Sequence, residues 1–251
     1  MDQIDLEEYA HYDNPLEGDL HWIVPNKLIA FKGPHSLPNG KLYHDVNGYR
    51  KFSPRFYTDA PFADMGVSTV VRLNELEYDP EDFESCGIHC VDLEFDDCSV
   101  PQPHIIAEFL HTAERAPGAV AVHCKAGLGR TGTLIALYMM KHHGFTAREA
   151  MGWLRIVRPG SVIGDQQEFL CCVEEADGDP AAAAAAFLAA AACKRRNSGR
   201  PVCRAVDMLG GGPAQDGEAD VAARAQALAD QVAAALQSPQ RTAQRARLAS
   251  C

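Results

Sequence analysis

One stretch constrains the fold of this chain more than any other, Val120-Ala-Val-His-Cys-Lys-Ala-Gly-Leu-Gly-Arg-Thr-Gly132. The apolar run from Ala119 to Val122 indicates a buried strand, and the residues from Thr131 onward indicate a helix. The connection contains two glycines, which let backbone N–H groups turn inward, and the helix dipole adds positive potential at the same place. A strand, a glycine-containing loop and a helix N-terminus in this order predict an anion site of phosphate size.

The loop also supplies a nucleophile. A thiol at Cys124, surrounded by inward N–H groups and a guanidinium, should ionise well below about pH 8.5, and the thiolate is the reactive form. Arg130 lies six residues further on, from where its planar fork can hold two phosphate oxygens. Thr131 can donate a hydroxyl hydrogen bond to the thiolate. The pattern Cys-x5-Arg-Thr after His123 therefore indicates cysteine-dependent hydrolysis of phosphate esters, which requires no metal or cofactor because N–H groups and Arg130 neutralise the phosphate oxygens.

Hydrolysis of a serine ester also needs a proton for the departing oxygen, and a loop carboxylic acid is the usual donor. The segment 94–101 ends a strand and enters a loop. Asp97 is the candidate acid and Asp96 its rival; the alternative is a pair of surface or capping charges, and the position before the cradle favours the catalytic role. A second loop precedes the last helix and carries Gln166 and Gln167. A glutamine there can hold the hydrolytic water, or it can face solvent at a helix N-terminus.

Strands alternate with helices along the chain, which predicts an α/β layer structure with a mostly parallel sheet flanked by helices. Strands are expected at 20–24, 27–31, 66–73, 88–95 and 119–122. Helices are expected at 54–65, 80–86, 101–115, 131–143, 146–158 and 164–175, with a short one before Asn14-Pro15, and residues 33–48 are expected to form a loop. Cys124 then lies at the carboxyl end of a strand, where active-site loops belong in such folds.

Charge divides the chain into two parts. Residues 1–178 carry 14 Lys+Arg against 28 Asp+Glu, a net charge of −14, whereas residues 179–251 have a net charge of +3. We therefore expect an acidic leader (1–19), a catalytic domain (20–177), and an Ala-rich, low-complexity tail (178–251) that is disordered or loosely helical. The acidic body disfavours nucleic acid and anionic membranes as partners and suits a basic substrate.

Cysteine usage and hydropathy bear on location. Nine cysteines have no disulfide-framework spacing, no signal peptide opens the chain, and no apolar run approaches the roughly 20 residues that span a bilayer. Cytoplasm or nucleus is the expected location. Cys86, His89 and Cys90 provide only half of a zinc-ligand pattern, with no matching second pair, so no metal site is expected.

The order and spacing of the candidate site residues resemble those of a known family, the cell-division-cycle-fourteen (mitotic-exit) dual-specificity protein phosphatases. The similarity covers roughly residues 5–175, and it is most specific in the loop His123–Arg130, hereafter the cradle, through Lys125 and Leu128. The matching segments are 8–12, 18–25, 31–35, 70–74, 97–101, 123–132 and 158–161, together with Ile163-Gly164 and Gln166-Gln167.

The resemblance implies a role for each matching residue. It implies a nucleophile at Cys124, a general acid at Asp97 and a water-orienting Gln166, with phosphate held by the cradle residues His123, Lys125, Ala126, Gly127, Leu128, Gly129 and Arg130. It also implies a dual-specificity phosphatase with a cell-cycle role. The implied substrates are phosphoproteins with basic residues after phosphoserine-proline, met by an acidic groove to which Asp13 and Asp19 correspond.

The chain departs from this family in three places. The usual amino-terminal companion domain is absent from the sequence, Cys98 stands where the family has Gly, and Asp165 stands where it has Pro. Two alternatives therefore stay open. Phosphoinositide phosphatases have a similar loop but carry a second Lys at the position of Leu128, and a non-catalytic phosphopeptide-binding module would retain the loop without turnover.

Overall fold

The computed structural model describes residues 5–176 and Phe187. The low-complexity tail expected over 178–251 lies outside the described residues, apart from Phe187. Residues 5–101 and 108–171 belong to one compact unit, and residues 102–107 and 172–176 belong to another. All the candidate site residues lie in the first unit.

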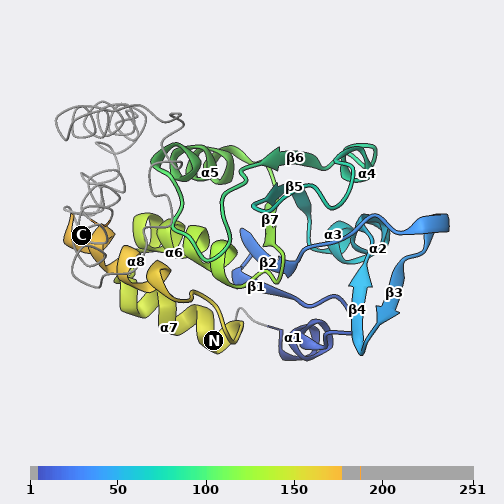
Figure 1. The fold of residues 1–251 in the computed structure, drawn as a ribbon, viewed down its shortest axis with the longest axis horizontal. Coiled ribbons are helices and arrows are strands. Elements are labelled where there is room, and N and C mark those ends of the chain that lie inside the picture. Colours follow the sequence, from blue (N-terminus) through green and yellow to red (C-terminus); the bar gives the residue numbers. More distant parts are fainter. Residues whose placement is uncertain (1–4, 177–186, 188–251) are drawn as a thin grey trace, which may run out of the picture. The chain divides into compact units, whose positions relative to one another are not determined.

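A five-stranded sheet organises the first unit, with the strand order β1-β2-β7-β5-β6 (Figure 1). Its strands are β1 (Leu20–Val24), β2 (Leu28–Lys32), β5 (Val67–Arg72), β6 (His89–Asp92) and β7 (Ala119–Cys124). β1 pairs antiparallel with β2, and every other pairing in this sheet is parallel. The expected α/β fold with a mostly parallel sheet is therefore confirmed, and β7 lies at its centre, buried along its whole length.

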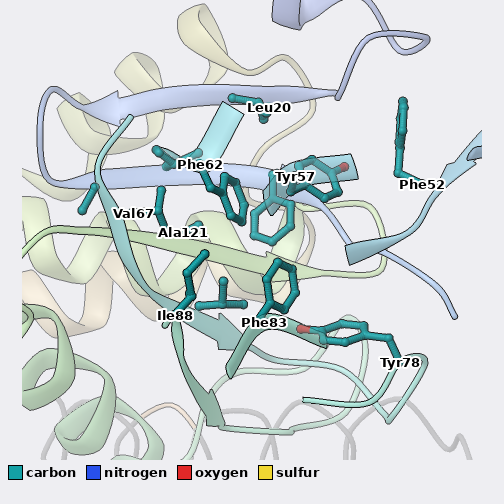
Figure 2. Close-up of a cluster of buried hydrophobic side chains, with 13 residues drawn as sticks. Leu20, Phe52, Tyr57, Phe62, Val67, Tyr78, Phe83, Ile88 and Ala121 are labelled. Carbon is teal, nitrogen blue, oxygen red and sulfur yellow. The ribbon is translucent and has the colours of Figure 1, made fainter. Parts of the chain in front are cut away.

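Aromatic side chains cover one face of this sheet. Phe31 from β2 lies with its ring centroid 5.0 Å from that of Tyr57 and 5.2 Å from that of Phe62. Figure 2 shows Tyr57 and Phe62 packed with Phe83 and with Ala121 of the central strand, and Phe31 belongs to the same buried cluster. Because side chains alternate along a strand, Ala119 and Ala121 join this cluster while their neighbours point to the opposite face.

Eight α-helices lie in the described part of the chain. They are α1 (Leu6–Asp13), α2 (Pro54–Asp59), α3 (Pro61–Asp64), α4 (Glu81–Glu84), α5 (Pro103–Arg115), α6 (Gly129–His143), α7 (Ala147–Val157) and α8 (Asp165–Glu175). α6 contacts β7 and β2, and α7 contacts β1 and α6, so these two helices cover the face opposite the aromatic cluster. Within the described part of the chain, no helix has the length and hydropathy needed to cross a bilayer.

The segment expected to be a loop at 33–48 contains half of a β-hairpin, so that prediction was wrong in part. β3 (Tyr43–Val46) pairs antiparallel with β4 (Tyr49–Phe52). The connecting residues Asn47 and Gly48 have φ values of 50° and 82°. Two consecutive positive φ values at Asn-Gly are the signature of a type I′ hairpin turn, which was available in the sequence.

The single helix expected from Pro54 to Met65 is instead two short helices, α2 and α3. Pro61 lacks a backbone N–H and disfavours helical geometry at the residue before it, and Ala60 accordingly has φ −145° and ψ −66°. Ser53, at the N-cap position of α2, makes no capping bond and donates its hydroxyl to the Leu42 carbonyl at 3.2 Å.

Candidate active site

The cradle connects the end of β7 to the start of α6, as the strand–loop–helix pattern predicts. The β2–β7 register places Lys32 beside Cys124. Gly127 has φ 68°, and a Cβ atom built there would lie 2.0 Å from the Phe31 carbonyl oxygen. No other residue type fits this close approach of the loop to β2, so the glycine is required by both conformation and space.

Cys124 lies at the base of the cradle, with 3% of its surface exposed. Burial by itself would raise the pKa of its thiol. The Thr131 hydroxyl, the backbone N–H groups of Thr131 and Leu128, and the Arg130 charge all favour the thiolate, and together they lower the pKa below its ordinary value. Thr131 Oγ1 is buried without a regular hydrogen bond to any other group in the described chain. The hydroxyl is therefore available to the sulfur.

Arg130 is 2% exposed and is held from one side only. Its Nη1 donates to the carbonyl oxygens of Leu73 at 3.2 Å and Phe95 at 2.9 Å. Its buried Nε and Nη2 make no hydrogen bond to the described residues, although Asp97 Oδ1 forms an ion pair with Nε at 3.3 Å. Buried donors without a hydrogen bond are rare and costly, and here they belong to a fixed guanidinium beside a thiolate. This arrangement suits a bidentate grip on an oxyanion.

Arg158, to which the sequence assigned no role, fixes the outer side of the cradle. It is 2% exposed; its Nε donates to the Gly127 carbonyl at 2.8 Å and its Nη2 to the Ala126 carbonyl at 2.9 Å. Because Arg158 holds the carbonyls of Ala126 and Gly127 away from the anion site, the backbone N–H groups of the cradle can face that site. Arg158 follows α7 directly and precedes a proline, but no sequence pattern predicts a contact across 31 residues.

Tyr78, which the sequence analysis did not identify, positions the residue before the nucleophile. Its hydroxyl lies 2.7 Å from Nε2 of the fully buried His123, whose Nδ1 lies 3.0 Å from the Cys124 carbonyl. Burial lowers the pKa of His123 to about 3, so the ring is neutral. A neutral ring accepts from Tyr78 at Nε2 and donates from Nδ1 to the Cys124 backbone.

Asp97 comes from a tight turn after β6. The Asp96 carbonyl accepts from the N–H and hydroxyl of Ser99, and Cys98 adopts φ 58°, a left-handed conformation that glycine adopts more readily. The turn brings Asp97 Oδ1 to 3.3 Å from Arg130 Nε, while the Asp97 side chain stays 63% exposed. Of the two candidate acids, Asp97 is therefore the one in contact with the cradle arginine.

Gln166 is fully buried beside the cradle, whereas Gln167 is not. Gln166 donates to the Ser99 carbonyl at 3.0 Å and accepts from the Ile163 N–H at 3.2 Å. A Cβ atom at Gly129 would lie 3.1 Å from Gln166 Oε1. Gln167 instead accepts from Arg155 at 2.8 Å. The structure thus brings Gln166 to the cradle and directs Gln167 elsewhere.

The two leader acids bind basic groups of the chain itself. Asp19 Oδ1 lies 2.8 Å from Arg158 Nη2, and Asp13 Oδ1 lies 3.0 Å from Nε2 of the buried His21. The side chain of Asp13 is 52% exposed and that of Asp19 is 24% exposed. Their role in a substrate groove stays a prediction.

The half-pattern of zinc ligands does not form a cluster. The Cys86 and Cys90 thiols lie 3.9 Å and 3.7 Å from the carbonyl oxygens of Asp82 and Pro80. In the described part of the chain, no three His, Cys, Asp or Glu side chains are arranged to hold a metal ion.

The proteins to which this chain is similar are phosphatases, in agreement with the geometry of the site. Residues 59–175 match the family described as "Dual specificity phosphatase, catalytic domain". Over 170 residues the chain is 50% identical to the dual specificity protein phosphatase CDC14AB of Danio rerio. This alignment covers 68% of this chain and 27% of that protein. It is 49% identical over 166 residues to the tyrosine-protein phosphatase cdc-14 of Caenorhabditis elegans, covering 66% of this chain and 23% of that protein.

The chain thus spans about a quarter of the length of these relatives. Among solved structures, it is similar to a kinase associated phosphatase carrying a serine in place of its catalytic cysteine. That likeness has a TM-score of 0.51 and 15% identity over 62% of this chain and 93% of the other, and it bears on the fold alone. Over about two thirds of its length the chain is thus a homologue of the CDC14 dual specificity phosphatases, and residues 59–175 match the catalytic domain of dual specificity phosphatases.

Proposed function

We propose that this chain hydrolyses phosphate monoesters of serine, threonine and tyrosine in proteins through a phosphocysteine intermediate. The proposal depends on one observation. The buried Cys124 thiol has a lowered pKa and interacts electrostatically with Arg130, whose buried Nε and Nη2 make no hydrogen bond to the described residues. A nucleophile and an oxyanion grip held in one rigid loop are the two parts that phosphoryl transfer to sulfur requires.

The proposed reaction has two steps. Cys124 sulfur forms a bond to phosphorus as the ester P–O bond breaks, and Asp97 gives its proton to the departing oxygen. A water held by Gln166 then attacks the phosphocysteine, returns a proton to Asp97, and releases phosphate with the thiolate. Arg130 and the cradle N–H groups neutralise the oxygens in both steps, and the Thr131 hydroxyl stabilises the departing sulfur.

We infer that the preferred substrates are phosphoproteins with a basic residue after phosphoserine-proline. The support is the family resemblance and the net charge of −14 on residues 1–178. Asp13 keeps about half of its carboxylate surface exposed beside His21, so it is better placed than Asp19 to meet a basic side chain. A cell-cycle role follows by the same resemblance.

Release of inorganic phosphate from three substrates tests the proposal. The substrates are a phosphoserine-proline-lysine peptide, a phosphotyrosine peptide and a phosphoinositide. We expect both peptides to be hydrolysed and Cys124→Ser to abolish turnover. Preferential hydrolysis of the phosphoinositide would replace the protein substrate by a lipid, and phosphopeptide binding without turnover would identify a binding module.

A further inference from the structure

A second cation lies beside the nucleophile, and a carboxylate neutralises it. Lys125 directly follows Cys124, and its Nζ forms an ion pair with Glu75 Oε1. The two side chains are 53% and 48% exposed, so the pair lies at the surface of the site. Lys125 lowers the pKa of the Glu75 carboxyl, and Glu75 raises the pKa of the Lys125 ammonium.

The backbone fixes this pair next to the anion site from both sides. Glu75 lies two residues after Leu73. The Leu73 N–H donates to the His123 carbonyl at 2.9 Å, and the Leu73 carbonyl accepts from Arg130. The Lys125 carbonyl accepts from the Gly33 N–H at 3.1 Å. The Glu75 carboxylate also interacts electrostatically with Arg130. The pair therefore lies within reach of a group bound beside the scissile phosphate.

The same loop places a second carboxylate against a basic side chain, His35, whose pKa is lowered by burial. Glu77 lies with its Oε2 3.2 Å from Nδ1 of His35, and the Ser36 N–H donates to the Glu77 carbonyl at 2.8 Å. His35 in turn interacts electrostatically with the buried His123 of the cradle. Two carboxylates from one loop thus pair with Lys125 and His35 on this side of the cradle, while Arg130 Nη2 has no hydrogen-bond partner among the described residues.

We propose that Glu75 is a specificity-determining residue, which selects against substrates with a second anionic group beside the scissile phosphate by holding Lys125 in an ion pair. A free Lys125 would bind a neighbouring phosphate or carboxylate of the substrate. With Glu75 in place, such a group meets a neutral pair and a further negative charge. This inference rests on the proposed function, because it concerns the same anion site.

Binding to the Cys124→Ser form tests the inference without turnover. The probes are a phosphotyrosine peptide and the same peptide with a second phosphate on the adjacent threonine, and the readout is the ratio of their dissociation constants. Glu75→Gln should shift this ratio about three- to tenfold toward the doubly phosphorylated peptide, since an exposed ion pair is weak but a freed ammonium can contact the added phosphate. Glu114→Gln is the matched control, because Glu114 also pairs with a lysine, Lys141, about three turns along α6 from Arg130.

Three results would overturn the inference. The first is an unchanged ratio in Glu75→Gln, and the second is binding of neither peptide. The third is an equal gain in Glu75→Gln when Lys125→Met is also present; we expect that gain to fall below about twofold, because no ammonium remains to contact the second phosphate. Phosphate release by the unaltered chain separates the two proposals. Turnover without a ratio shift would overturn the inference alone, and a ratio shift without turnover would overturn the proposed function alone.

Discussion

Replacement of Arg130 by lysine tests how the cradle holds the transferring phosphate. Arg130 Nη1 is anchored by the carbonyl oxygens of Leu73 and Phe95, which aims Nε and Nη2 as a fixed pair of donors. Lysine keeps the positive charge but offers a flexible ammonium in place of the planar fork. The Arg130→Lys variant therefore removes the geometry of the grip while retaining its charge.

The size of the loss follows from the donors removed. Loss of one preorganised donor to a developing oxyanion typically costs about 2.7–4 kcal/mol, which is about 10²–10³ in kcat. The Leu73 and Phe95 carbonyls also lose a shared donor, which we expect to lower the free energy of unfolding by about 1–3 kcal/mol. The loss of kcat is the larger and more specific effect.

The assay is steady-state hydrolysis of an aryl phosphate, with urea denaturation to establish that the variant is folded. Arg148→Lys, an exposed arginine on α7, is the matched control and should keep kcat. A folded Arg130→Lys variant with kcat within about threefold of the unaltered chain would refute the bidentate grip, since charge alone would then suffice.

Three further variants test the parts around the cradle. Asp97→Asn should reduce kcat about 10²–10³-fold on a phosphoserine peptide and much less on an aryl phosphate, whose leaving group needs no proton; equal losses would move the acid role to Asp96. Alkylation of Cys124 should follow a pH profile whose midpoint lies below the ordinary pKa of a cysteine thiol. Thr131→Val should move that midpoint upward, because the hydroxyl favours the thiolate, and an unmoved midpoint would remove this role. Tyr78→Phe should lower the free energy of unfolding by about 1–3 kcal/mol in urea, because His123 Nε2 is then buried without a partner, and a loss under about 0.5 kcal/mol would contradict that.

The sequence predicted the central elements because their signals are local. The apolar run that ends at Val122 indicates a buried strand by itself, and the two glycines before Arg130 limit how the chain enters the next helix. The hairpin around Asn47-Gly48 was missed although its turn signal is equally local, since the many turn residues of 33–48 favoured a loop. The break at Pro61 was likewise available, because proline disfavours a continuous helix.

The supports of the cradle were not predictable in this way. Arg158 reaches the carbonyls of Ala126 and Gly127, and Tyr78 reaches His123 across 45 residues. Such contacts depend on how strands and loops meet in space, and neither residue lies in a pattern that names its partner. Glu75 is similar, because its pairing with Lys125 follows from the parallel arrangement of β5 and β7 rather than from spacing along the chain.

The most direct measurement of the central claim is rapid mixing with a phosphotyrosine peptide, an acid quench, and mass spectrometry of the digested chain. We expect the mass of one phosphoryl group on the peptide that contains Cys124, formed before phosphate appears and absent in Cys124→Ser. Release of phosphate at an unchanged rate by Cys124→Ser, with no adduct on the unaltered chain at any time, would contradict attack by this sulfur.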